Sequence, residues 1–552
     1  MSTATAIPSA PQTVPTSRGN TFAGTRTMIR FMLRRDRIRI PVWILGLTVY
    51  AAGALSSYEQ NYPEASDRET IADMTDLPAM VAMVGDNYAP DEPYTHGLMF
   101  GHVTFVIVAI IFGLMGVLLM IRHTRAEEEA GRAELIRSSV LGRHAQLTAA
   151  LIVVCGASLV AGLLVSLSIS GSGVDGVTTG GAYLYGMGLG LVGVVFATVA
   201  AVTGQITEYA RGASGMALAV LGAAYAVRSV GDVGETFLSW LSPLHWARAT
   251  KPFSAEERAW PLLLLVVLAA VLIVVAANLS NRRDVGAGLR PPRLGSPTAS
   301  AALSGPLGLA VRLQRSGVVA WAIGLAVFGA FYGAMISAAD EMFDEITALE
   351  DLWTFDGASF ADRWIVSFIG MLGMLAAVPA ILSVQRLRSE ETVGRAEPVL
   401  ATAVSQSRWA ASHLTVAFAG SAAVVLFGGL GFGIAAAIDG GDAAYLGKSV
   451  AAAAVYIPAV WVAAGLAIAL FGLVPRAMGL AWIIPVYGFL VVYMGDLFGI
   501  DESAHNLSPF GFVPELPAED FNAVPLVILL AITAVLTWAG LAGFRRRDLH
   551  ST

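Results

Sequence analysis

Twelve apolar runs, each about as long as a lipid bilayer is thick, alternate with polar segments along this chain. In the first half they cover residues 40–57, 101–121, 147–169, 181–203, 214–231 and 260–279. In the second half they cover residues 317–337, 364–384, 409–438, 446–471, 478–498 and 523–543. A helix needs roughly 20 apolar residues to cross about 30 Å of hydrocarbon. The pattern therefore predicts an all-α polytopic membrane protein with about 12 transmembrane helices.

The composition agrees with this prediction. Charged residues make up only 14% of the 552 residues and hydrophobic residues make up 56%, whereas a soluble chain usually carries about 25% charged residues. The single cysteine, Cys155, excludes an intrachain disulfide and a cysteine-rich metal site.

Several polar motifs occur twice at a nearly constant spacing of 263 to 266 residues. The matched stretches are Arg125–Glu134 with Arg388–Glu397, Gly231-Asp232 with Gly495-Asp496, Leu241-Ser242-Pro243 with Leu507-Ser508-Pro509, and Arg282-Arg283-Asp284 with Arg546-Arg547-Asp548. A constant spacing predicts two fused, repeated six-helix halves. Because each half has an even number of spans, their pseudo-two-fold axis should lie along the membrane normal.

The chain is expected to divide into four parts. Residues 1–20, rich in Ser, Thr, Pro and Ala, form a disordered N-terminal tail. Residues 21–284 form the first six-helix half, and its segment Thr21–Arg39 alternates apolar and Arg residues. That segment fits an amphipathic helix on an anionic membrane surface, or simply a basic flank that fixes topology. Residues 285–304 form a cytoplasmic linker rich in Gly, Pro, Ser and Arg, and residues 305–552 form the second half.

The distribution of charge predicts the orientation, because Lys and Arg favour the cytoplasmic side of a membrane. They gather in the N-terminal segment, the two copies of the Arg125–Glu134 motif, the linker and the C-terminus. The loop Ser57–Gly101 and the loop after the seventh span are strongly acidic. We therefore expect both termini in the cytoplasm and both acidic loops outside. The loop 232–259 has mixed charge, and its Arg248, Lys251 and Arg258 are expected outside or at the lipid headgroups.

The motif R-A-E-E-E-A-G-R-A-E and its second copy R-S-E-E-T-V-G-R-A-E each join two apolar runs, so each is expected to form a polar helix. Their shared charged and glycine positions are Arg125, Glu127, Glu128, Gly131, Arg132 and Glu134 in the first copy, and Arg388, Glu390, Glu391, Gly394, Arg395 and Glu397 in the second.

In each copy a Glu precedes an Arg by four residues, as Glu128 precedes Arg132 and Glu391 precedes Arg395. Such pairs face each other on a helix and stabilise it by roughly 0.2–0.5 kcal/mol. The glycine opposes a helix by about 1 kcal/mol relative to alanine, so its recurrence predicts close backbone approach or a bend. We interpret the two copies as docking surfaces for a partner that binds both halves. The simpler interpretation is a solvated loop helix.

Together with Leu-Ser-Pro between the fifth and sixth spans, the E-E-x-x-G motif resembles the cytoplasmic loop of type-2 ABC exporter permeases. The fused twelve-span form is similar to actinobacterial permeases for tetronasin, polyketide antibiotics and multidrug efflux, over nearly the whole chain. Arg132 and Arg395 depart from the Thr of many relatives. The resemblance implies that the polar segments are coupling helices, each receiving one of two ATP-binding subunits. Closure of those subunits would rock the halves from inward-facing to outward-facing and export hydrophobic drugs or antibiotics from a bacterial cell through its plasma membrane.

The chain is not expected to hydrolyse ATP itself. The stretch nearest to G-x-x-x-x-G-K-[ST] is Gly441–Ser449, G-D-A-A-Y-L-G-K-S, which has one residue too many between its glycines and lies in an expected outer loop. A phosphate-binding loop lies between a strand and a helix instead. ATP and Mg²⁺ are therefore expected in a separate subunit, and this chain is expected to be a transport subunit without a cofactor of its own.

In the exporter class that the chain resembles, the second and fifth spans of each half line the substrate cavity. The repeat spacing then selects Phe105 with Phe368, and Tyr225 with Phe489. Such aromatic pairs could hold a flat, lipophilic molecule. Packing within the protein or contact with lipid is the alternative for each.

Charged groups within the expected spans are few. Arg228 precedes Asp232 by four residues, and we expect the two to form a helical ion pair. His96, His102 and His413 show no metal-ligand spacing. The alternative function is a proton-driven twelve-helix multidrug transporter. Such a protein normally needs an acid or histidine deep in the bilayer, and this chain offers few.

Overall fold

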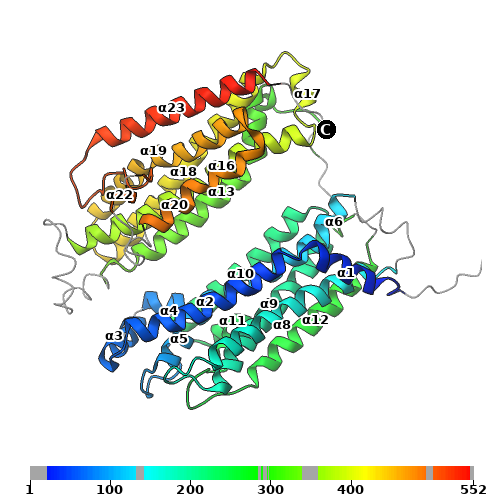
Figure 1. The fold of residues 1–552 in the computed structure, drawn as a ribbon, viewed down its shortest axis with the longest axis vertical. Helices are drawn as coiled ribbons and strands as arrows, with labels where there is room; N and C mark the ends of the chain where they lie inside the picture. Colours follow the sequence, from blue (N-terminus) through cyan, green and yellow to red (C-terminus); the bar gives the residue numbers. More distant parts are fainter. Residues whose placement is uncertain are drawn as a thin grey trace, which may run out of the picture. The chain divides into compact units, whose positions relative to one another are not determined.

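The computed structural model describes residues 21–76, 78–131, 142–283, 287–289, 295, 297–337, 359–492, 502–505 and 507–547. The chain divides into two compact units, Met1–Leu294 and Gly295–Thr552. Both units consist of helices (Figure 1), and no strand occurs in the residues described. The all-α prediction is therefore confirmed. The expected N-terminal tail, residues 1–20, lies outside these residues.

Among the described residues, twelve helices are long and apolar enough to cross a membrane, which confirms the predicted number. In the first unit they are α2 (Arg39–Asn61), α5 (His96–His123), α8 (Ala145–Ser170), α9 (Thr179–Ile206), α10 (Ala210–Val233) and α12 (Pro261–Asn281). In the second unit they are α13 (Pro306–Gly333), α16 (Phe360–Thr392), α18 (Gln406–Asp439), α19 (Ala444–Leu473), the 3-10 segment η3 (Pro475–Trp482) continued by α20 (Ile483–Val492), and α23 (Ala523–Arg545).

Helix α9 forms the centre of the first unit, where it packs against α5, α8, α10 and α12. It carries no charged residue and many small ones, so neighbouring backbones approach it closely. A Cβ added to Gly116 of α5 would lie 2.4 Å from the carbonyl oxygen of Gly193 in α9. The peripheral helix α12 instead leaves Leu263, Val267 and Val274 exposed, as expected for a surface that faces lipid.

Helix α19 has the corresponding position in the second unit, where it packs against α16, α18 and α23. Here too glycine allows the closest approach, because a Cβ on Gly472 would lie 1.9 Å from the carbonyl oxygen of Gly540 in α23. The same packing principle therefore positions the central helix of each unit.

Shorter helices lie at the two ends of the first unit (Figure 1). One end carries α1 (Thr25–Arg35) and α6 (Arg125–Glu129), and we call it the polar-helix end. The opposite end carries α3 (Ala65–Thr75), α4 (Pro78–Val84), η1 (Phe237–Leu241) and α11 (Pro243–Arg248). In the second unit the polar-helix end holds the last turns of α16, α17 (Glu397–Leu400) and the end of α23. Two further short elements are η2 (Ala301–Leu303) and α22 (Glu502–His505).

The predicted amphipathic segment forms helix α1. Met28 and Met32 are buried on one side of it, whereas Phe31 and Leu33 are about half exposed on the other. Helix α1 packs against α8. Its apolar outer face, set among arginines, suits the boundary between headgroups and hydrocarbon.

Candidate functional site

The first copy of the repeated motif forms a helix separate from the second span. Thr124 leaves the helical conformation, with φ −114° and ψ −87°, and α6 then runs for five residues from Arg125 to Glu129. Gly131 follows with φ +70°, and its N–H donates to the Glu128 carbonyl at 3.0 Å. A left-handed residue of this kind ends a helix and is most readily glycine.

The second copy differs at its start and agrees at its end. Helix α16 continues without a break through Arg388 to Thr392. The separate polar helix expected from the sequence therefore does not form at this position. Gly394 then adopts φ +75°, and its N–H donates to the Glu391 carbonyl at 3.0 Å. Apart from the chain neighbours, no atom of the described residues lies within 4 Å of a Cβ built on either Gly131 or Gly394. The recurring glycine therefore makes a bend and not a close backbone contact.

Arg125 is buried at the polar-helix end of the first unit, where it serves as an internal anchor. Its Nε donates to the carbonyl of Thr207 at 2.6 Å, and its Nη2 donates to the carbonyl of Ala287 at 2.9 Å. Its Nη1 contacts the carboxylate of Glu128 at 2.5 Å. The neighbouring Glu127 forms an ion pair with Arg35 of α1. Arg125 and Glu127 thus connect α6 to three other parts of the unit, namely Thr207, Ala287 and helix α1.

Glu128 has a second and stronger partner, Arg283, which follows the sixth span. The two side chains form a bidentate pair with both N–O distances at 2.8 Å. Nε of Arg283 also donates to Oε1 of Gln205 at 2.6 Å. The predicted partner Arg132 lies outside the described residues, as does Glu134.

In the second unit Glu391 pairs with Arg547, at 2.9 and 2.8 Å. The predicted pairing of Glu391 with Arg395 is therefore wrong. Gly394 turns the chain before Arg395, whose guanidinium lies 3.5 Å from Glu390 and is 59% exposed. Glu390 is bound more closely by Arg386, at 2.8 Å.

The exposed part of each segment lies next to these buried charges. In the first copy Glu129, Ala130 and Gly131 are exposed. In the second copy the exposed residues are Thr392, Val393, Arg395, Glu397 and Pro398. A groove of about 450 Å³ lies beside the second copy. It is lined by Gln385, Arg388, Ser389, Thr392, Arg476, Met478 and Gly479.

The four candidate cavity aromatics have different surroundings. Phe105 is fully buried in α5, with its ring centroid 5.3 Å from that of Tyr185 in a perpendicular contact. Phe368 stacks on Tyr332 at 3.9 Å. Tyr225 lies under the guanidinium of Arg228 at 5.0 Å, and Phe489 in α20 is 45% exposed. The assignment of these four residues to a cavity stays a prediction.

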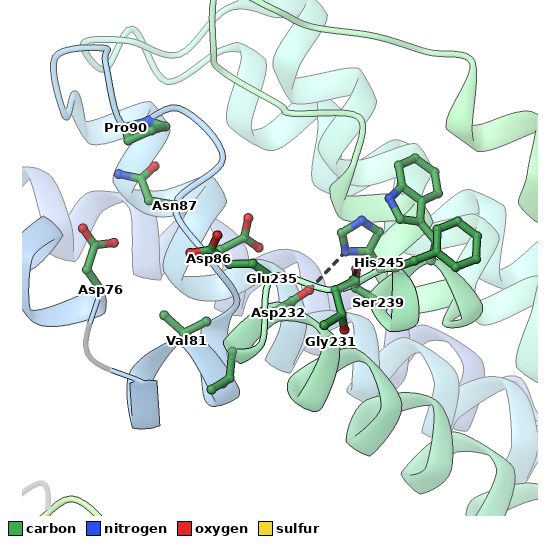
Figure 2. A pocket seen from close by; sticks show the side chains of 14 residues that line it. Asp76, Val81, Asp86, Asn87, Pro90, Gly231, Asp232, Glu235, Ser239 and His245 are labelled. Atoms are coloured by element: carbon green, nitrogen blue, oxygen red, sulfur yellow. Dashed lines mark hydrogen bonds and ion pairs between the residues drawn. The ribbon is translucent and has the colours of Figure 1, made fainter.

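A pocket of about 970 Å³ opens at the opposite end of the first unit (Figure 2). It is lined by Asp76, Val81, Asp86, Asn87, Pro90, Gly231, Asp232, Val233, Glu235, Thr236, Phe237, Ser239, Trp240 and His245. Figure 2 shows Asp232 directed toward His245, and their side chains lie 3.3 Å apart. The lining is strongly acidic at its rim and has aromatic side chains on one side.

Two buried arginines neutralise part of this acidic lining. Arg228 binds Asp232 at 2.9 Å, which confirms the predicted helical ion pair. Arg248 binds both Asp86, at 2.6 Å, and Asp232, at 3.3 Å. Burial opposes ionisation of Asp86, but the nearby Arg248 guanidinium outweighs it and holds the pKa of Asp86 below its usual value.

Arg248 is buried within the first unit, where its side chain is only 2% exposed. Gly85 makes room for it. This glycine has φ +101°, and a Cβ there would lie 2.3 Å from Cζ of Arg248. Because Asp86 and Arg248 are 162 residues apart, no local spacing could predict this contact. The mixed charge of the loop 232–259 was the available signal.

Comparison with known proteins identifies related chains. A family model described as "Multidrug efflux system permease Rv1217c, C-terminal domain" matches residues 26–279 and 303–545. The multidrug efflux system permease protein Rv1217c of Mycobacterium tuberculosis (strain ATCC 25618 / H37Rv) is 41% identical over 539 residues. The match covers 97% of this chain and 96% of that relative.

Proposed function

We propose that this chain, which belongs to the family of the multidrug efflux system permease Rv1217c, is the membrane subunit of an ATP-driven exporter of lipophilic drugs or antibiotics. The observation that carries the ATP-driven mechanism is the pair of matched polar segments. Each joins the second and third spans of its unit, ends in the same left-handed glycine turn, and leaves part of its surface exposed. A helix that only closed a loop would not require the same turn in both units.

In this proposal the polar-helix end of each unit faces the cytoplasm and receives one ATP-binding subunit. The exposed residues that follow the buried glutamates, among them Glu129, Val393 and Arg395, supply the contact surface. Val393 is 59% exposed, and an apolar side chain at the tip of a polar segment is suited to a pocket on a partner. Arg388 and Arg476, in the adjoining groove, would attract acidic side chains of that partner.

The ATPase activity is assigned to separate subunits. The stretch that comes nearest to a phosphate-binding loop becomes helical at Ala444, and Lys448 within it pairs with Asp362 at 2.7 Å. A lysine used in this way is not free to reach a nucleotide phosphate. Mg²⁺ and ATP would therefore bind to the partner, and this chain would convert the closure of two such partners into movement of its helices.

Purification of this chain with the ATP-binding subunit encoded beside it tests the proposal. We expect two ATP-binding subunits per chain and an ATPase activity that lipophilic compounds change. A Val393→Asp variant should weaken the association, because it places a charge in the proposed apolar contact. Leu507→Asp serves as the control, because it places the same charge on an exposed apolar residue outside the polar segments and outside the spans.

Failure of any ATPase to co-purify, with drug efflux that depends on the proton gradient instead, would contradict the proposal. That result would favour the proton-driven transporter. Efflux should be measured in the same reconstituted vesicles with ATP alone and with a proton gradient alone, so that the two energy sources are compared directly.

A further inference from the structure

Two motifs that lie far apart in the sequence meet at the polar-helix end of each unit. The second glutamate of R-x-E-E contacts the second arginine of R-R-D. The residues are 155 positions apart in the first unit, Glu128 with Arg283, and 156 apart in the second, Glu391 with Arg547. In both units the arginine follows the sixth span and holds the carboxylate with two hydrogen bonds.

We propose that these two pairs, which we call the Glu–Arg connections, pass movement of the polar segment to the sixth span of its unit. This inference rests on the proposed function, since it presumes that a partner moves the polar segment. It adds a role that docking does not require. The four residues are positioning residues and do not themselves contact the partner.

Burial separates this role from docking. The glutamate side chains are each only 6% exposed, and their arginine partners are 8% and 19% exposed. A carboxylate that is covered on most sides and already accepts two charged hydrogen bonds has little capacity left for a partner subunit. In the first unit the bidentate pair also fixes the relative orientation of Glu128 and Arg283, which a contact through one nitrogen does not.

Both connections join a buried glutamate to the arginine that follows the sixth span, but their atoms and surroundings differ. Arg283 donates through both terminal nitrogens, whereas Arg547 binds both oxygens of Glu391 through Nη2 alone. Arg283 is supported by a hydrogen bond to Gln205 in the first unit. Arg547 lies instead against the rings of Phe471 and Phe544, at 5.1 and 5.5 Å. The same charge contact is thus built on two different supports, which points to the contact itself as the shared requirement.

The first glutamates of the two motifs provide an internal comparison. Glu127 pairs with Arg35 of α1, whereas Glu390 pairs with Arg386 of its own helix. These residues occupy matched positions but join different parts of the protein. In both units it is the second glutamate that binds the arginine after the sixth span.

The sixth spans need such a connection because they lie at the periphery. Helix α12 packs mainly on α9, and α23 packs mainly on α19. Their outer faces carry exposed apolar residues such as Val267 and Val535. An ion pair at the end of each helix lets the polar segment pull on it directly, in addition to any movement that passes through the central helix.

The test is a double substitution, Arg283→Gln with Arg547→Gln, in the full chain co-expressed with its ATP-binding subunit. The matched control is Arg282→Gln with Arg546→Gln, which changes the preceding, exposed arginine of each motif. We expect the test variant to bind the ATP-binding subunit and keep basal ATPase activity. Drug-stimulated ATPase activity and drug efflux should fall by roughly 5-fold or more, the lower end of typical coupling between sites. The control should behave as wild type.

Restoring the contact with reversed charges gives the decisive result. Glu391→Arg with Arg547→Glu should recover a large part of the stimulation and efflux that Arg547→Glu alone removes. The first unit is left unexchanged, because an arginine at position 128 would meet the buried Arg125. Arg283→Lys with Arg547→Lys keeps both charges and removes the bidentate geometry of the first unit. It should give an intermediate loss, and it serves as the test if the Gln variant does not fold.

Wild-type efflux in the Gln variant, or a folded Lys variant as active as wild type, would overturn the inference. Loss of ATP-binding subunit from the Gln variant would overturn it as well, by assigning these residues to docking. Failure of the wild-type chain to bind any ATP-binding subunit would refute the proposed function first, and the inference with it. The wild-type arm therefore distinguishes the two failures.

Discussion

Replacing Asp232 with asparagine should strongly destabilise the first unit. The Asp232 carboxylate is 1% exposed and binds two guanidiniums, those of Arg228 and Arg248, which are 0% and 2% exposed. Asparagine keeps the shape of the side chain and removes its charge. Arg248 retains Asp86 at 2.6 Å, so Arg228 is the residue that loses its carboxylate.

The expected loss of unfolding free energy follows from the contacts that Arg228 loses and keeps. Removing one partner of a buried ion pair costs about 3–5 kcal/mol, because the other charge is left uncompensated. Arg228 keeps hydrogen bonds to the carbonyls of Ala82 and Met83, at 2.5 and 3.2 Å, so we take the lower value of about 3 kcal/mol. For a domain of this size roughly 2–4 °C of melting temperature corresponds to 1 kcal/mol, which gives a decrease of about 6–12 °C.

An exposed acid with a similar set of partners supplies the control. Glu256 binds Lys251 at 2.7 Å and Arg258 at 3.1 Å, but its side chain is 66% exposed. Because water and salt screen such contacts, Glu256→Gln should leave the melting temperature unchanged. The comparison thus separates burial from the number of ion pairs.

Thermal unfolding of the purified chain in lipid nanodiscs, followed by tryptophan fluorescence, measures the effect. Trp240, one of 11 tryptophans, lines the pocket beside Asp232 and stacks on Trp260 with centroids 5.7 Å apart, so unfolding of this region contributes to the signal. An Asp232→Asn variant that melts with the wild type, or one that shifts no more than Glu256→Gln, would refute the reasoning.

Two further predictions concern packing and pH. Gly116→Ala should lower the free energy of unfolding by about 1–3 kcal/mol through overpacking, because its new Cβ would lie 2.4 Å from the Gly193 carbonyl oxygen. Gly156→Ala should be tolerated in the same melting assay, since its Cβ would meet no atom of the described residues within 4 Å. The lowered pKa of Asp86 means that its pairing with Arg248 stabilises the folded state fully above the usual value of 3.8 and is lost as the pH falls below it. Melting temperatures of wild type and Asp86→Asn should therefore differ at pH 6 and converge as the pH is lowered below that value, and a constant difference down to pH 3 would contradict the assignment.

The spans could be predicted from the sequence because the bilayer imposes a length and a polarity on every crossing helix. Their ends were harder to predict. The polar segment begins at a break at Thr124 in the first unit but continues α16 in the second. The expected eleventh span starts instead with the 3-10 segment at Pro475. These differences depend on local backbone conformation, which hydropathy does not record.

The candidate site was predicted as a set of motifs and not as a set of contacts. The spacing of four residues correctly paired Arg228 with Asp232, because both lie on one helix. The same spacing failed for Glu391 and Arg395, because a left-handed glycine ends the helix between them. The contact of Glu391 with Arg547 depends on tertiary structure, and no local rule could have identified it.

The two units have matching contacts at the polar-helix end and different residues at the opposite end. At the polar-helix end the contacts of Glu128 and Glu391 agree in both units. At the opposite end the first unit has a buried ionic cluster around Asp232, whereas the repeat spacing places Val492 where the first unit has Arg228. In the proposed function, each polar-helix end receives one ATP-binding subunit, and this requires equivalent contacts there but not at the opposite ends. We therefore expect substitutions of Glu128 and Glu391 to have additive effects on drug-stimulated ATPase activity. Substitutions in the ionic cluster around Asp232 should act through the first unit alone.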